Sequence, residues 1–322
     1  MPESWKRRAR AAFLEGGGLR LARWATRSSL RILMYHRFPN TQGLELQCRH
    51  LRDHYQPVSM NDAAEMLSGN RPLTPYAVAV TVDDGYRDFY TSAYPIFSAY
   101  RIPVTVYLVT DFLDGNAWLW VDQVRYLFHH TKQPQCKMAL PGRAFQLSCM
   151  TEEERRAAGR DACEALKQLS NEDRLSALRL LPELLEVELP ATPPRGSEPL
   201  VWDEVRALAQ AGVEFGSHTR RHPILSKVGS ATELDDEIIG SKRRMEGVLE
   251  TKVRHFCYPN GARDDISPEA VETVRRAGFE TAVVTEPGLN RPGEDLLRLR
   301  RIGVDPRYQQ QYFEQCAAAF GV

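Results

Sequence analysis

Seven short runs of apolar residues recur along the chain, and most of them are continuous rather than alternating. They cover residues 31–36, 77–82, 103–109, 213–216, 254–258, 280–285 and 298–304. A continuous apolar run of this length is typical of a parallel strand that is buried on both faces. The pattern therefore predicts a parallel sheet of about seven strands.

Helix signals lie between these runs. Ser267 followed by Pro268 predicts the start of a helix, and Gly278 predicts its end. Thr232, with an acidic residue three positions later, predicts the start of a helix that continues to about Leu249. Repeated alternation of strands and helices indicates an α/β fold, either a barrel or an open sheet.

About 100 residues between the third and fourth runs break this alternation. Capping-box-like patterns that begin at Thr151 and Ser170 predict two helices there. Residues 190–199 have the proline-rich composition of a linker. We therefore predict a helical insertion over about residues 111–200.

The charges of the chain balance overall but not locally. The 322 residues include 42 Lys and Arg and 42 Asp and Glu, so the net charge is zero. A neutral chain argues against nucleic acid as the main partner, because phosphate binding needs a basic surface. Residues 1–31 carry eight Lys or Arg and two Asp or Glu, a net charge of +6, which leaves −6 for the rest. We predict a basic segment over residues 1–30, followed by a barrel domain over residues 31–322.

The basic segment has two interpretations. Trp5 and Trp24 are interleaved with its charges, so it either packs on the domain as a solvated helix or makes peripheral contact with an anionic membrane. No run of about 18 apolar residues occurs, and Glu15 interrupts the apolar stretch that a secretory signal needs. Six scattered cysteines without a CxxC pair favour free thiols in a reducing compartment. We expect a cytoplasmic protein, with contact at the inner leaflet left open and no obligate protein partner indicated.

Two adjacent carboxylates, Asp83 and Asp84, follow the second apolar run and precede Gly85. In parallel α/β folds the functional groups lie at the carboxyl ends of the strands. Adjacent side chains there point in different directions, so one acid could bind a metal while the other serves as a base. The alternative is a simple turn, for which Asp and Gly are common residues.

Two histidines, His218 and His222, follow the fourth apolar run with i, i+4 spacing. On a helical turn this spacing places both imidazoles on one face, where they could share a metal. His50 and His54 have the same spacing but lie in a charged, helix-like stretch with no strand before it. We interpret that second pair as part of a solvated surface.

Two more strand ends carry candidate groups. Tyr258, Pro259 and Asn260 form a tight turn that could present a backbone N–H or an aromatic wall to a substrate, or could be only a turn. His36 ends the first run, and its role is either structural or catalytic.

Asp84, His218 and His222 together make a set of two histidines and one carboxylate. Three protein ligands that leave one position open are typical of a catalytic metal site. With Asp83 beside them as a base, the set predicts hydrolysis of an amide or an ester.

The order of the motifs TVDDG, SHTRRHP and YPNG resembles that of the NodB-type polysaccharide deacetylases, carbohydrate esterase family 4. The likeness runs from about Arg31 to Asp305, apart from the insertion. It implies removal of acetyl groups from saccharides on a distorted barrel of about seven β/α units. It also implies that Asp83 is the general base, that Asp84 and the two histidines hold a divalent metal, usually Zn²⁺ with Co²⁺, Ni²⁺ or Mn²⁺ as alternatives, and that the backbone N–H of Asn260 binds the oxyanion.

The chain departs from the family pattern in three places. Cys257 stands where the family usually has an arginine that orients the catalytic Asp. The usual Asp/Trp motif is not evident around residues 285–290, and the usual final Leu-x-His has no match in residues 299–305. A subgroup that begins with a "YH" strand looks similar and also lacks the final His.

These departures leave two roles to fill. We predict His36 as the general acid, and Arg298 or Arg301 as the partner of Asp83. The leading hypothesis is N-deacetylation of an amino sugar in a bacterial surface glycan or its lipid-linked precursor. The alternatives are an O-acetyl esterase or deformylase that uses the same site, and a non-catalytic saccharide-binding protein.

Overall fold

The main sheet of the protein is parallel throughout. The computed structural model describes residues 17–116, 118–140 and 143–320. The strands follow the order β10-β1-β3-β4-β7-β8-β9, and β2 pairs with β3 beside this path. Their bounds are β1 Arg31–Tyr35, β2 Gln56–Val58, β3 Ala77–Val82, β4 Val104–Leu108, β7 Glu214–Ser217, β8 His255–Cys257, β9 Thr281–Val283 and β10 Ile302–Gly303.

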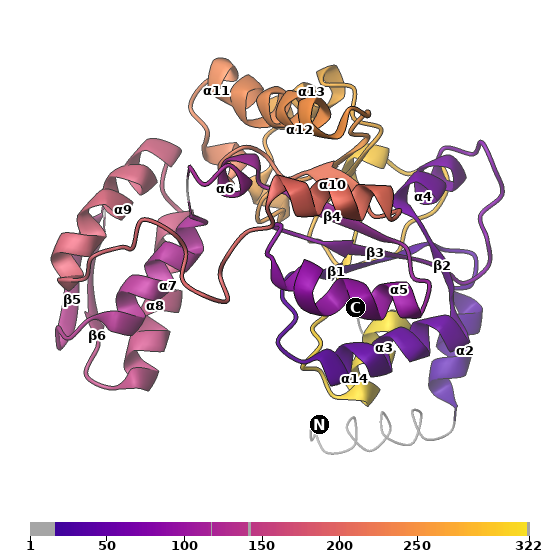
Figure 1. Ribbon diagram of the computed structural model, residues 1–322, viewed down its shortest axis with the longest axis horizontal. Coiled ribbons are helices and arrows are strands. Elements are labelled where there is room, and N and C mark those ends of the chain that lie inside the picture. The colour runs from indigo at the N-terminus through magenta and orange to yellow at the C-terminus, as the bar shows by residue number, and fades with distance from the viewer. Residues whose placement is uncertain (1–16, 117, 141–142, 321–322) are drawn as a thin grey trace, which may run out of the picture.

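The sheet curls into a distorted barrel (Figure 1). Strand β10 pairs with β1 at one edge, and a parallel bridge joins Val283 of β9, at the other edge, to Leu299 just before β10. The predicted parallel α/β barrel is therefore confirmed. The sequence pattern missed β2, because three residues with a central Pro57 form no recognisable apolar run.

Helices surround the sheet and bury its main core (Figure 1). None of the described helices is long and apolar enough to cross a membrane. The bounds are α2 Gly18–Ala25, α3 Thr41–His54, α4 Met60–Leu67, η1 Phe89–Ala93, α5 Tyr94–Ala99, α6 Thr110–Leu113, α10 Trp202–Gln210, η2 Leu225–Lys227, α11 Ala231–Asp235, η3 Asp236–Gly240, α12 Ser241–Leu249, η4 Arg263–Asp265, α13 Pro268–Arg276, η5 Leu296–Arg298 and α14 Gln310–Ala317.

Side-chain caps fix where two of these helices start. Helix α13 begins as predicted, because the side chain of Ser267 accepts a hydrogen bond from the backbone N–H of Ala270. The start predicted at Thr232 was wrong by two residues. Ser230 is the cap of α11 and accepts from the N–H of Glu233, and the helix then runs through the π-helical turn η3 into α12.

The segment between β4 and β7 forms a lobe with its own apolar core, beside the barrel (Figure 1). It contains α7 Trp120–His130, β5 Gln135–Leu140, β6 Arg143–Ser148, α8 Glu152–Lys167 and α9 Asn171–Leu185. We call these elements the insertion lobe. The antiparallel hairpin β5–β6 was not predicted, although the burial of β5 alternates residue by residue, as expected for a strand with one solvated face.

The chain that returns from the insertion lobe is hydrogen-bonded to the loop after β3. The N–H of Leu200 donates to the carbonyl of Gly85 at 2.8 Å, and the N–H of Arg87 donates to that of Glu198 at 2.9 Å. The lobe also contacts this loop through Tyr86, whose hydroxyl donates to Asp122 of α7 at 2.6 Å. These bonds fix the lobe against the same loop that carries the paired carboxylates.

Only part of the predicted basic segment belongs to the described residues, since residues 1–16, which include Trp5, lie outside them. Helix α2 leaves Leu21 57% exposed and Trp24 55% exposed. Residues 29–33 are buried, and here the chain enters the barrel as β1.

Candidate active site

The candidate side chains follow the carboxyl ends of four strands of the main sheet, in which β4 lies between β3 and β7. His36 follows β1, Asp83 and Asp84 follow β3, His218 follows β7 and Tyr258 follows β8. All of them line one pocket of about 430 Å³. Because parallel strands end at the same rim of a barrel, segments more than 200 residues apart in the sequence meet there.

Asp84 lies between the two histidines. Its Oδ1 atom is 3.6 Å from Nε2 of His218 and 3.6 Å from Nε2 of His222. The two imidazole rings lie with their centroids 4.7 Å apart. One oxygen and two nitrogens therefore converge with the spacing that a single bound ion requires.

The backbone that brings these groups together is not helical, so the predicted helical turn at 218–222 was wrong. Thr219 and His222 have φ values of 67° and 60°, in the left-handed region, and the chain bends sharply between them. The hydroxyl of Thr219 accepts a hydrogen bond from the N–H of His222 and stabilises the bend. Asp84 also has a left-handed φ of 75°. Strained residues of this kind are often found at functional sites.

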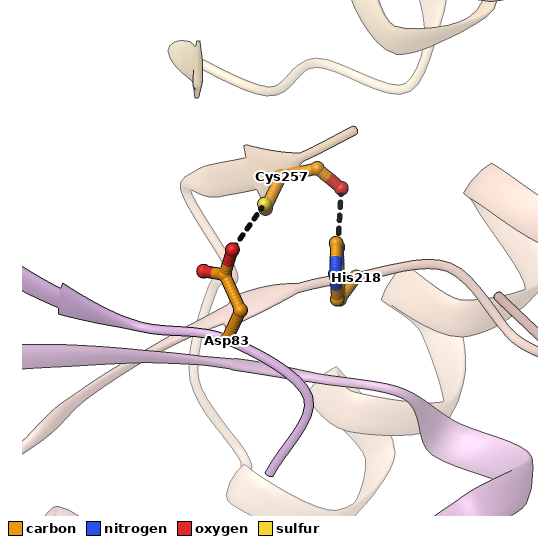
Figure 2. Close-up of side chains that lie close together, drawn as sticks. All are labelled: Asp83, His218 and Cys257. Carbon is orange, nitrogen blue, oxygen red and sulfur yellow. Dashed lines mark hydrogen bonds between the residues drawn. The ribbon is translucent and has the colours of Figure 1, made fainter. Parts of the chain in front are cut away.

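The protonation of the two histidines suits metal binding. Nδ1 of His218 lies 2.8 Å from the backbone carbonyl of Cys257, which can only accept, so Nδ1 carries the proton and Nε2 is left with its lone pair (Figure 2). Burial lowers the pKa of His218 and of His222, which favours their neutral forms.

Asp84 is a buried carboxylate that accepts no hydrogen bond from the described residues. Burial raises its pKa, and the nearby histidines only partly oppose that shift. A buried carboxylate facing two neutral imidazole nitrogens is a donor set that a divalent cation would neutralise. The residues present therefore fit a metal.

A second cluster, Asp83, His218 and Cys257, is equally compact but does not fit a cation. Its sulfur atom is directed at Asp83 (Figure 2). Nη2 of Arg301 lies 3.2 Å from that sulfur, so a positive charge already occupies this side of the site. Burial also raises the pKa of the Cys257 thiol well above its usual range, which keeps it neutral.

Arg301 forms a buried, bidentate ion pair with Asp83. Its Nη1 and Nη2 atoms donate to the two carboxylate oxygens at 2.7 and 2.8 Å. Its other N–H groups donate to Thr81, Cys257 and the carbonyl of Val284. Burial alone would raise the pKa of Asp83, but the charge and hydrogen bonds of Arg301 outweigh it and hold that pKa well below its usual range.

Of the two arginines proposed as partners of Asp83, the structure pairs it with Arg301 and not with Arg298. Arg298 ends η5 and lines a separate surface pocket with Glu294, Asp295 and Arg300. The two arginines are only three residues apart, but Arg298 lies at the surface of the barrel and Arg301 is buried in its interior.

His36 lies close to Asp83. Its Nε2 atom is 3.8 Å from Oδ2 of Asp83, and 46% of its side chain is exposed. It therefore stands at the mouth of the pocket, where it can contact both a substrate and solvent.

The turn after β8 presents one free backbone donor. Asn260 has a φ of 60°, and its carbonyl accepts from Thr285, while Gly261 donates back to Pro259. The N–H of Asn260 donates to none of the described residues. The aromatic wall beside it is Tyr258, which is buried and whose hydroxyl has no hydrogen-bond partner in the described part of the chain.

The insertion lobe supplies the opposite wall of the pocket, which sequence reasoning did not find. Its contribution comes from α7 and α8 and includes Trp120, Arg125, Arg160 and Lys167. No sequence motif indicates these residues, because their place depends on how the lobe packs against the barrel.

The prediction that His50 and His54 lie on a solvated surface was wrong for His50. His50 is only 6% exposed, so it does not belong to a solvated surface as predicted. It packs edge-on against Phe313 of α14 and lies 3.4 Å from the carboxylate of Glu314. A helical face that looks charged in the sequence can still be covered by a helix from the other end of the chain.

The chain matches one protein-family model and is similar to several known proteins. The family model described as "Polysaccharide deacetylase" matches residues 70–282, which is 213 of the 322 residues. The Bacillus subtilis protein YxkH is 20% identical over 287 residues, 87% of this chain and 72% of that protein. The poly-beta-1,6-N-acetyl-D-glucosamine N-deacetylase of Escherichia coli K12 is 40% identical over 78 residues, which span 24% of this chain and 12% of that enzyme.

Solved structures share the fold at low sequence identity. The deacetylase PplD of Streptococcus pyogenes, solved with acetate, aligns with a TM-score of 0.59 and 18% identity over 89% of this chain and 97% of its own. IcaB from Ammonifex degensii aligns with a TM-score of 0.58 and 18% identity over 91% of this chain and 98% of its own.

Proposed function

This chain belongs to the polysaccharide deacetylase family, and we propose that it is a metal-dependent hydrolase that removes the N-acetyl group of an amino sugar. The observation that carries the proposal is the arrangement of Asp84 between His218 and His222, next to the ion pair of Asp83 with Arg301. It combines a set of metal ligands with a carboxylate that is held ionised.

In this proposal Asp84, His218 and His222 hold a divalent ion, for which Zn²⁺ is the first candidate. Such an ion would polarise the acetamide carbonyl and make a water molecule more acidic. Asp83 accepts the proton of the attacking water, because Arg301 keeps its carboxylate charged and fixed in orientation.

Two further groups act on the carbonyl oxygen and the leaving amine. The free N–H of Asn260 donates to the oxygen as negative charge develops there. The C–N bond then breaks, and the amine leaves with a proton that we assign to His36, since the imidazole lies at the pocket mouth near Asp83. The products are acetate and the free amino sugar.

The choice of an N-acetyl substrate is supported by the Escherichia coli relative, whose name specifies N-deacetylation of a poly-N-acetylglucosamine. An O-acetyl esterase or a deformylase would use the same groups. Comparing acetamido, formamido and O-acetyl forms of one sugar separates these three activities, and we expect the acetamide to be turned over with the highest kcat/KM.

The test is acetate release by the purified chain, saturated with Zn²⁺ or Co²⁺, from N-acetylglucosamine oligomers and lipid-linked saccharides. We expect turnover that EDTA abolishes and added metal restores. Turnover that EDTA leaves unchanged would contradict the proposed metal dependence. Saccharide binding without any turnover, unchanged in Asp83→Asn, would instead identify a non-catalytic binding protein.

We also propose a cytoplasmic location with peripheral contact at the inner leaflet through residues 1–30. The exposed Leu21 and Trp24 of α2, which stand beside basic residues, support this contact. Removal of residues 1–28 should abolish association with anionic liposomes, and Leu21→Ser/Trp24→Ser should weaken it. Association that persists after the deletion would rule out this segment as the contact.

A further inference from the structure

A second pocket opens beside the candidate active site and is strongly basic. It has a volume of about 520 Å³ and lies between the insertion lobe and the barrel. Its lining contains one acidic residue, Asp122, and five arginines, namely Arg37, Arg125, Arg155, Arg156 and Arg160. We call it the arginine pocket.

The arginine pocket adjoins the catalytic one. Arg125 and Arg160 line both pockets. Arg37, on the barrel side of the arginine pocket, directly follows His36, which lines the catalytic pocket. A single ligand can therefore reach Asp84 with one part and the arginines with another.

The charges of this pocket are only partly neutralised from within the protein. Arg160 is exposed and makes no hydrogen bond or ion pair with any described residue. Arg125 reaches its nearest carboxylate, Asp122, only at 3.7 Å, and that carboxylate already accepts a hydrogen bond from Tyr86. The Nε atom of Arg155 is buried and has no partner among the described residues.

The remaining two arginines have structural partners. Arg37 pairs with Asp88, and Arg156 pairs with Glu152. They add positive potential, and so does Arg155, whose Nη1 donates to the carbonyls of Cys149 and Met150. Arg125 and Arg160 have N–H groups still able to bind a ligand. Two aromatic side chains, Trp118 and Tyr126, line the same pocket and offer apolar surface to a ring.

We propose that the arginine pocket binds a phosphate or diphosphate group of the same molecule whose acetamide reaches Asp84, so that the substrate is a phosphate-esterified amino sugar. This inference rests on the proposed function, and it narrows the substrate class. Several guanidinium groups around one pocket match the several oxygens of a phosphate, to which arginine donates paired hydrogen bonds. A neutral saccharide would leave these cations without a counter-charge.

The phosphate could belong to a nucleotide-linked or to a polyprenyl-linked sugar. Both present the same diphosphate next to the sugar, so the pocket chemistry is shared. They differ in what lies beyond the diphosphate, and the kinetic comparison below separates them.

The binding test uses inorganic pyrophosphate and calorimetry on the full chain. Arg160→Ala is the informative variant, because Arg160 has no described partner that its removal would leave unpaired. Arg52→Ala is the matched control, since Arg52 is also an exposed helical arginine without a partner among the described residues, but lies on α3 outside both pockets. We expect Arg160→Ala to weaken pyrophosphate binding about tenfold, as for the loss of one charge-assisted hydrogen bond, and Arg52→Ala to leave it unchanged.

Failure to bind pyrophosphate, or equal binding by wild type and Arg160→Ala, would overturn the inference. Equal weakening in Arg160→Ala and Arg52→Ala would overturn it too, because it would indicate a general effect of charge. If pyrophosphate bound only through a metal ion in the catalytic pocket, Arg160→Ala would not weaken its binding. That result would also count against the proposal.

The kinetic test compares four forms of one sugar. The neutral form is the methyl glycoside of N-acetylglucosamine. The charged forms are N-acetylglucosamine 1-phosphate, uridine diphosphate N-acetylglucosamine and a short-chain polyprenyl diphosphate N-acetylglucosamine. We expect a lower KM for the phosphate esters, and an increase of about tenfold in that KM in Arg160→Ala. The ester with the higher kcat/KM identifies the source of the phosphate. If the neutral glycoside is turned over as well as the esters, the inference fails while the proposed function stands. If nothing is turned over, the proposed function fails, and the pyrophosphate measurement still decides whether the pocket binds phosphate.

Discussion

Two pairs of histidines in this protein have the same spacing and opposite surroundings. The rings of His218 and His222 lie 4.7 Å apart, and those of His50 and His54 lie 4.6 Å apart. Both pairs are edge to face. Neither their spacing nor their ring geometry distinguishes a candidate metal site from a structural contact.

The difference lies in what each pair faces. His218 and His222 follow a strand end, and both point at the carboxylate of Asp84 in a pocket open to solvent. His50 faces the helix α14, where Glu314 is 3.4 Å from one ring nitrogen and the other nitrogen is buried without a partner among the described residues. A metal site needs converging lone pairs and an entry path, and only the first pair has both.

The largest difference between the two histidine pairs is expected in catalysis. His218→Ala removes one proposed ligand, and we expect acetate release to fall about a thousandfold or more, since a catalytic ion contributes several kcal/mol. His54→Ala makes the same change in the other pair, where we expect no loss of kcat/KM. Equal losses in both variants would break the distinction between the pairs.

A smaller loss is expected when the base is removed and the ligands stay. Asp83→Asn keeps the shape of the side chain but cannot accept the proton, so we expect kcat to fall by about 10²–10³ with bound metal retained. Metal analysis alongside acetate assays checks both parts. Loss of the ion in Asp83→Asn would mean that Asp83 is a ligand rather than a base.

Breaking the buried ion pair of Asp83 with Arg301 should lower the stability of the fold as well as the activity. Arg301→Met leaves the buried carboxylate of Asp83 without its partner, and we expect a loss of about 3–5 kcal/mol in the free energy of unfolding. Adding Asp83→Asn to Arg301→Met removes the uncompensated charge and should restore part of that stability. Chemical denaturation of the single and double variants measures this, and additive losses would contradict the account of the pair.

The smallest expected effect concerns the structural pair and pH. Burial lowers the pKa of His50 from about 6.5 to about 3. Between these values the unfolded chain takes up a proton that the folded chain does not, so the free energy of unfolding falls as the pH falls below about 6.5, by up to about 1.4 kcal/mol per pH unit. His50→Gln should therefore lose less stability than wild type between pH 7 and pH 5, and an equal loss would show that His50 does not drive this dependence.

Much of the fold and part of the site could be predicted from the sequence. Continuous apolar runs mark buried parallel strands, and the groups after them, Asp83, Asp84 and His218, come together because those strands end at one rim. The sequence could not choose between Arg298 and Arg301, because that choice depends on which residue near β10 faces the barrel interior. It also could not place Arg125 or Arg160, since their position depends on packing between two separate cores.

The buried state of His50 was beyond sequence reasoning for a related reason. The helix that covers His50, α14, lies about 260 residues later in the chain. The charged residues around His50 in the sequence do not indicate that this helix packs against it. Local patterns thus predict which residues end a strand or cap a helix, while tertiary packing decides which of them are covered.

The central claim is that Asp84, His218 and His222 hold one divalent ion, and the most direct test is the number of ions bound per chain. Elemental analysis after saturation with Zn²⁺ and removal of the excess should find one ion in wild type and in His54→Ala, and none in His218→Ala. An ion that persists in His218→Ala, or that is lost equally from His54→Ala, would contradict the assignment.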